Sequence, residues 1–145
     1  MNRYHTIIVC LLRFDAIGQM TAVIAIAMPH AWMDSAHRWA GLGEMPEAPV
    51  VGYLARTLSA FYVMHGALSF GISLDVQRYW PLLRLWAVSF VVIGAVILGI
   101  DIGLQMPTLW TASEGPFMVV FGSAILALMR KATAEDSGAA KSTIE

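Results

Sequence analysis

Hydrophobic residues gather in four long runs along this chain, and short polar segments separate the runs. The runs cover residues 6–28, 50–74, 82–106 and 108–129. An α-helix needs about 20 predominantly apolar residues to cross the hydrocarbon core of a bilayer, which is roughly 30 Å thick. Each run is long enough, so the pattern predicts four membrane-spanning helices.

The segment between the first two runs predicts a short extra helix at residues 30–40. On a helix, Trp32 and Trp39 fall on one face, while charged residues lie elsewhere. Tryptophan favours the depth of the lipid headgroups, so we expect an amphipathic helix lying at the membrane interface. Gly41 and Gly43 follow directly and are expected to end it.

Two prolines bear on where the fourth span begins. Pro107 separates the third and fourth runs and is the expected break, because proline removes a helical hydrogen bond. Pro116 lies in the first turns of the fourth run. The fourth helix is therefore expected either to start near Ser113 or to kink there.

Composition supports a membrane protein with a single domain. Of its 145 residues, 58% are hydrophobic and 13% charged, whereas soluble domains average about 45–50% and about 25%. Four spans use most of the chain, so we expect one all-α four-transmembrane-helix bundle over residues 1–130. The polar residues 131–145 predict an irregular cytoplasmic tail. The net charge of −1 gives no indication of nucleic acid as a partner.

The distribution of Lys and Arg predicts the orientation of the spans. Flanking positive charges favour the cytoplasmic side of a membrane. The side holding the N-terminus, the second loop and the C-terminus carries Arg3, Arg78, Arg84, Arg130, Lys131 and Lys141. The opposite side carries only Arg38. We therefore expect both termini in the cytoplasm.

Three ionisable residues share one depth near the outer end of the bundle. With a rise of about 1.5 Å per residue, Arg56, Asp101 and Glu114 each lie about 8–9 Å below the outer boundary. Tyr53 and Trp110 lie one turn further out. Charged residues inside a membrane are costly, face the bundle interior and mark function. The five residues predict a polar cluster.

Two interpretations of this cluster stay open. In one, Arg56 pairs with a carboxylate and locks three helices together. In the other, the cluster lines a pocket open to the outer face, where Arg56 binds an anionic or carbonyl group. A carboxylate there would be available as an acid or base.

A second polar layer lies deeper in the predicted bundle. Asp15 on the first span and His65 on the second reach similar depths and are placed to pair. Gln19 lies one turn from Asp15 on the same face. Arg56 and His65 are nine residues apart, hence on opposite faces of one helix, so a shared narrow pore is not expected.

Small residues at four-residue spacing predict close helix approaches. The frames are Gly18 with Ala22, Ala67 with Gly71, and Gly99 with Gly103. Such frames allow backbones to approach within a bundle or between copies of a chain, and the pattern does not separate these uses.

The sequence predicts no metal or haem site. His5, His30 and His37 lie at a chain end or in a loop, so none can face His65 across a haem at one depth. In the loop, His30, Asp34 and His37 share one side but lack a further nearby ligand. We expect no cofactor, and leave open a bound lipid or quinone.

The layout resembles the DoxX-like group of small four-span bacterial membrane proteins. A long first loop precedes residues 53–56 (YLAR), which open the second span. A small-residue run with Ser59, Ala60 and Gly66 follows, then an acidic third span and residues 113–116 (SEGP) in the fourth.

This resemblance, which covers most of residues 6–130, implies a four-helix bundle in the bacterial inner membrane. Members of the wider group are linked to quinone-dependent oxidation or to complexes with redox-stress partners. In this sequence the resemblance extends that link to Arg56 and Glu114 alone. Cys10 is the single cysteine, so no thiol pair is present for thiosulfate-type redox chemistry.

Together these features favour an integral membrane protein without catalytic activity. We expect an accessory subunit of a larger membrane complex, or a binder of a lipid or quinone-like ligand near the outer face, with a homo-oligomer left open. One alternative is an enzyme acting on an isoprenoid-like lipid with Asp101 or Glu114 as acid or base. Another is a small proton-coupled carrier that uses Asp15, His65 and the carboxylates of Asp101 and Glu114.

Overall fold

The computed structural model describes residues 2–142, and within them the chain is entirely helical apart from its turns and loops. The helices are α1 (Arg3–Met20), α2 (Val23–Ile26), α3 (His30–Trp39), α4 (Pro49–Leu74), α5 (Trp80–Gly103), α6 (Thr108–Ser113) and α7 (Gly115–Ser142). Four segments are long and apolar enough to cross a membrane: Arg3–Ile26, Pro49–Leu74, Trp80–Gly103 and Thr108–Gly138. The predicted all-α bundle with four spans is confirmed, as expected of a multi-pass membrane protein.

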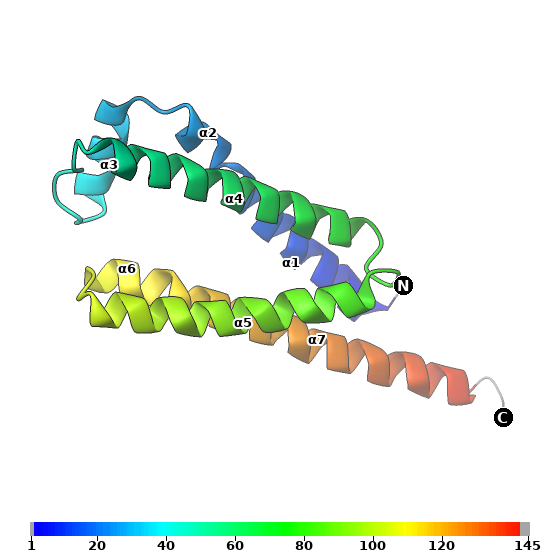
Figure 1. Cartoon of the computed structure of the whole chain (residues 1–145). Coiled ribbons are helices and arrows are strands. Elements are labelled where there is room, and N and C mark those ends of the chain that lie inside the picture. The colour runs from blue at the N-terminus through cyan, green and yellow to red at the C-terminus, as the bar shows by residue number, and fades with distance from the viewer. Residues whose placement is uncertain (1, 143–145) are drawn as a thin grey trace.

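The four long helices are arranged as two antiparallel pairs (Figure 1). Helix α1 packs along α4, and α5 packs along α7. The pairs meet mainly at the end that holds the N-terminus, where α1 also contacts α7. Toward the α3 and α6 end the two pairs diverge. The hydrophobic core, with Ile8, Leu12, Ile72, Leu83 and Ile125 almost fully buried, therefore lies in one half of the bundle.

Glycines allow close contact between the two helices of each pair. The glycines that do so are not those of the predicted four-residue frames. A Cβ atom on Gly94 would lie 2.8 Å from the carbonyl oxygen of Gly115, and one on Gly66 would lie 2.9 Å from that of Ala16. Backbones therefore touch between α5 and α7 and between α1 and α4. Glycines of the predicted frames, Gly18, Gly71, Gly99 and Gly103, have no neighbouring atom within 4 Å of such a Cβ.

Two of the spans are interrupted. The first was expected to be continuous over residues 6–28, but it breaks after Met20. There the Thr21 hydroxyl donates a 2.6 Å hydrogen bond to the carbonyl of Gly18, a local bond that competes with the helical pattern. The fourth breaks at Glu114, between α6 and α7, where Pro116 limits the continuation. The break predicted near Ser113 is confirmed.

The third span is slightly shorter than predicted. Helix α5 ends at Gly103 rather than at residue 106, and Gln105 adopts a left-handed φ of 54° that turns the chain toward α6. Helix α3 matches the predicted loop helix, and Gly41 and Gly43 follow it with φ of 80° and 79°. Trp32 and Trp39 are both exposed, as an interfacial helix requires.

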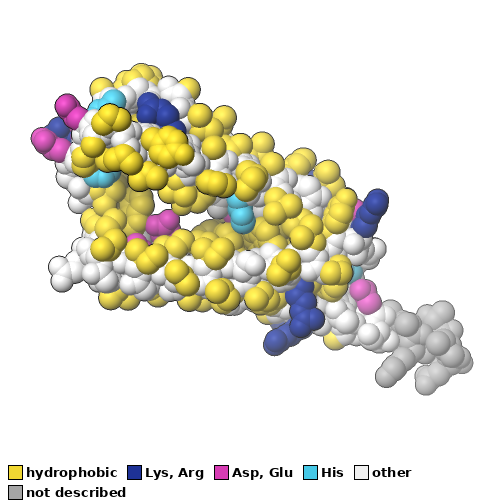
Figure 2. Space-filling model, in the orientation of Figure 1, with side chains coloured by type: hydrophobic (Ala, Val, Ile, Leu, Met, Phe, Trp, Pro, Cys, Tyr) yellow, Lys and Arg dark blue, Asp and Glu magenta, His cyan; other side chains and the backbone are white. Residues whose placement is uncertain are grey.

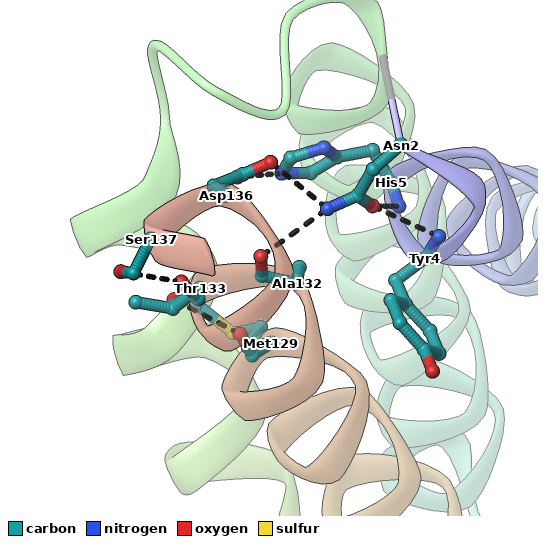
Figure 3. Close-up of polar contacts among 8 residues, drawn as sticks. All are labelled: Asn2, Tyr4, His5, Met129, Ala132, Thr133, Asp136 and Ser137. Atoms are coloured by element: carbon teal, nitrogen blue, oxygen red, sulfur yellow. Dashed lines mark hydrogen bonds and ion pairs between the residues drawn. The ribbon is translucent and has the colours of Figure 1, made fainter. Parts of the chain in front are cut away.

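The predicted irregular tail is wrong within the described residues, because α7 continues as a helix to Ser142. Contacts with the N-terminus hold this extension (Figure 3). The Asn2 side chain donates to the carbonyl of Ala132 at 3.2 Å and to Asp136 at 3.0 Å. Nε2 of the buried His5 lies 3.8 Å from the Asp136 carboxylate. These partners are distant in sequence, so local composition did not predict them.

Candidate functional site

Arg56 does not join the predicted polar cluster. Its guanidinium donates to the carbonyl of Ile26 at 3.1 Å, of Met28 at 3.0 Å and of Gly52 at 3.3 Å. Carbonyls at the end of a helix lack partners within it, so Arg56 satisfies groups that the short helix α2 leaves free. Within the described chain it makes no ion pair with a carboxylate, and the predicted lock by Arg56 is wrong. Tyr53 is also outside the cluster, with 66% of its surface exposed.

Glu114 is held instead by a tyrosine from the other helix pair. The hydroxyl of Tyr62 on α4 donates a 3.2 Å hydrogen bond to Oε1 of Glu114. Both side chains are half-buried. Glu114 occupies the break between α6 and α7, and its backbone N–H donates to the carbonyl of Trp110 at 3.1 Å. Trp110 therefore contributes a backbone contact here.

Asp101 lies near the same junction but is more deeply buried. It is 5% exposed, and its Oδ2 atom is buried without a hydrogen-bond partner. A Cβ on Gly115 would touch Leu98, which precedes Asp101 by three residues on α5. Asp101 therefore lies about one helical turn from the break that carries Glu114. The two predicted carboxylates share a depth, while the predicted arginine is bonded elsewhere.

The inner layer is brought together as a compact network. Asp15 on α1 is 4% exposed and accepts a 2.7 Å hydrogen bond from the Ser69 hydroxyl of α4. Gln19 donates to Asp15 Oδ1 at 3.4 Å, and His65 Nε2 lies 3.7 Å from Oδ2. These contacts tie α1 to α4 at the level where the two helix pairs still touch.

His65 also extends the inner layer to the second helix pair. Its ring stacks on Phe90, with ring centroids 5.2 Å apart, and on Trp86 at 5.5 Å, both from α5. Phe121 of α7 meets Phe90 edge to face at 6.0 Å, and Phe117 lies against Phe121 at 5.3 Å. An aromatic cluster thus joins α4, α5 and α7 where the pairs begin to diverge.

A hollow separates the two helix pairs beyond this aromatic cluster. Figure 2 shows the hollow in the space-filling surface, walled mostly by hydrophobic side chains. Acidic side chains are visible inside it and a histidine lies at its edge. The Tyr62–Glu114 hydrogen bond crosses between the same two pairs. An apolar cavity with few polar groups is the usual form of a site for a small hydrophobic ligand.

No metal centre is found among the described residues. Within residues 2–142 no three His, Cys, Asp or Glu side chains gather closely enough to hold an ion. In the loop that holds His30, Asp34 and His37, the side chains have other partners. The Nδ1 atom of His37 lies 3.0 Å from the carbonyl oxygen of Gly43. The Met45 N–H donates to Asp34 at 2.8 Å, and this bond, with the ion pair to Arg38, holds the pKa of Asp34 below its ordinary value.

Sequence reasoning missed Tyr62, Ser69 and the α5 aromatics as members of the site. A signal was present, since Tyr62, His65 and Ser69 share one face of α4 at helical spacing. Nothing local indicated that this face meets both Asp15 and Glu114, because that depends on how the two helix pairs are placed.

Comparison with known proteins adds no relative to this picture. No family model, no curated protein and no solved structure matches the chain.

Proposed function

We propose that this protein binds a hydrophobic ligand with a hydroxyl or carbonyl head group, such as a lipid or a quinone, in the hollow between its helix pairs. The observation that carries the proposal is the Tyr62–Glu114 hydrogen bond, which crosses between the two helix pairs that the hollow separates. A ligand hydroxyl would donate to the Glu114 carboxylate, whereas a ligand carbonyl would accept from the Tyr62 hydroxyl in exchange for its bond to Glu114, because a phenol has one proton to donate.

The apolar walls support this ligand class over a polar solute. Hydrophobic side chains line most of the hollow. Phe117, Phe121 and Phe90 form a continuous aromatic cluster between α5 and α7. A hydrocarbon tail would pack against the apolar walls through dispersion contacts, and a flat ring would also stack on aromatic side chains. The divergence of the helix pairs provides a route of entry from the bilayer.

We also propose the setting of this activity. The charge distribution favours an orientation with both termini in the cytoplasm. The layout favours membership of the DoxX-like group, and that resemblance implies a bacterial inner membrane. In this setting the protein acts as an accessory subunit that presents its ligand to a larger membrane complex or to a second copy of the chain.

Native mass spectrometry of the protein released from its own membrane in mild detergent tests the proposal. We expect a bound hydrophobic molecule on the wild-type protein, and its loss in Tyr62→Phe with Glu114→Gln. Tyr53→Phe is the matched control, since Tyr53 is exposed on the same helix and should keep the ligand. A wild-type protein that binds neither native lipids nor added quinone would overturn the proposal, as would equal binding by all variants.

A further inference from the structure

A groove outside the hollow runs between α5 and α7 near the chain termini. It has a volume of about 390 Å³. The residues that line it and enter the argument are Trp80, Arg84 and Val88 of α5, and Leu126, Arg130 and Thr133 of α7. On each helix the lining residues follow one another at three- or four-residue spacing, so the groove follows both helices lengthwise.

The groove carries two positive charges that have no ion-pair partner among the described residues. Arg84 and Arg130 lie on neighbouring helices, both are exposed, and neither forms an ion pair or hydrogen bond within the described residues. Figure 2 shows Lys and Arg side chains standing together on the α5 and α7 side of the bundle. Two like charges on one groove raise the local concentration of anions.

Polarity changes along the groove in the order found in a phospholipid. Trp80 begins α5, at the boundary of the apolar span, and Thr133 lies beyond the hydrophobic part of α7. Val88 lies one turn deeper than Arg84, and Leu126 lies one turn deeper than Arg130. These two side chains make the deeper part of the groove apolar. Arginine and tryptophan at the interface, with aliphatic residues below them, match a phosphate, a glycerol backbone and an acyl chain.

We propose that this groove binds an anionic phospholipid of the surrounding bilayer. The two guanidinium groups hold the phosphate, since arginine pairs with phosphate through two parallel hydrogen bonds. The Trp80 ring lies at headgroup depth and the acyl chain runs along Val88 and Leu126. The site is separate from the hollow between the helix pairs and does not depend on the ligand proposed there.

Native mass spectrometry with defined lipids tests this site. The wild-type protein, purified in mild detergent, is incubated with phosphatidylglycerol or with phosphatidylcholine, and retained adducts are counted as collision energy rises. We expect phosphatidylglycerol to be retained at energies that remove phosphatidylcholine. Arg84→Gln with Arg130→Gln should weaken phosphatidylglycerol binding by about 30-fold, because each interfacial arginine contributes about 1 kcal/mol, which is a roughly fivefold effect.

Lys131→Gln is the matched control, because it removes the same charge from the adjacent position of α7 and does not line the groove. It should bind phosphatidylglycerol like the wild type, and Arg84→Lys with Arg130→Lys should keep most of the binding. Equal retention of the two lipids by the wild type would overturn the proposal. So would an equal loss in the Lys131 variant, or glycerol phosphate competing as well as the whole lipid.

Discussion

The Tyr62 hydroxyl donates to the Glu114 carboxylate across a distance of 3.2 Å, from the middle of α4 to the break between α6 and α7. This bond joins the two helix pairs in the half of the bundle where they diverge. The bond links the two pairs, and in the function proposed above it is also the polar group that a ligand would meet.

A double-mutant cycle measures how much the Tyr62–Glu114 hydrogen bond stabilises the bundle. Tyr62→Phe, Glu114→Gln and the double variant are unfolded in mixed micelles by titration with sodium dodecyl sulfate. Interhelical hydrogen bonds in membranes contribute about 0.6 kcal/mol on average and at most about 1.7 kcal/mol. We expect a coupling free energy in this range between Tyr62 and Glu114. Additive effects of the two substitutions would show that the bond does not stabilise the bundle.

Ser69→Ala should destabilise the protein much more than Ser59→Ala. Both serines are buried on α4, but Ser69 donates to the Asp15 carboxylate of α1 at 2.7 Å. Ser59 donates to the Ala55 carbonyl of its own helix at 2.8 Å. Loss of a donor to a buried carboxylate costs about 1–3 kcal/mol, whereas loss of the local bond changes stability by less than about 0.5 kcal/mol. Equal effects in the same micelle titration would argue against the Asp15 network.

Gly94→Ala and Gly99→Ala distinguish the glycines that pack from those that face open space. A Cβ at position 94 would lie 2.7 Å from Met118 and 2.8 Å from the Gly115 carbonyl, and one at 99 meets no atom within 4 Å. Overpacking costs about 1–3 kcal/mol, so Gly94→Ala should unfold at lower detergent strength. Gly99→Ala should be neutral or stabilising by up to about 1 kcal/mol through helix propensity. The reverse order of stability would mean that α5 and α7 pack through other faces.

Arg56→Gln should loosen α2 and leave the rest of the bundle intact. The substitution removes the donors that satisfy the Ile26 and Met28 carbonyls. We expect faster amide hydrogen exchange over residues 21–29, with α5 and α7 unchanged. Arg13→Gln, an exposed arginine on α1, is the control and should exchange like the wild type. A loss of protection throughout the chain would instead favour the lock between spans.

The loop after α3 should loosen in acid. The Met45 N–H and the Arg38 guanidinium favour the charged form of Asp34, so the pKa of this carboxyl is lower in the folded loop than its ordinary value of 3.8. A lowered pKa contributes stability that is present above the ordinary pKa and lost as the pH falls through the folded value.

We therefore expect the protection factor of the Met45 amide, which corrects for slower intrinsic exchange in acid, to be constant at pH 5 and above and to fall below pH 3.8, as Asp34 takes up a proton. Nuclear magnetic resonance of the Met45 amide measures this directly. Asp34→Asn should lose most of the pH dependence. A pH response that persists unchanged in this variant would assign it to a different group.

Local features of the sequence were enough to predict the spans, the loop helix and the break before α7. The length of an apolar run determines whether a helix can span the membrane, and Pro116 and the glycines after Trp39 determine where a helix breaks or ends. These effects are local, so they do not depend on how the helices are arranged. The depth of each ionisable residue in the membrane was also predictable, because an α-helix rises by about 1.5 Å per residue. On that basis Asp15 was correctly placed at the level of His65, and Asp101 lies within about one helical turn of the break that carries Glu114.

Only the tertiary structure decided which groups meet. In an almost wholly apolar helix nearly every face is hydrophobic, so the pattern does not define which face turns toward a neighbour. Backbone contact at Gly94 and Gly66 sets the rotation of each helix about its axis. In this arrangement Arg56 donates to a carbonyl at the end of the interrupted first span. The same packing brings Tyr62 rather than Arg56 to Glu114. The sequence thus determined a membrane bundle with charges at two depths, and the packing of backbones determined the partner of each charge.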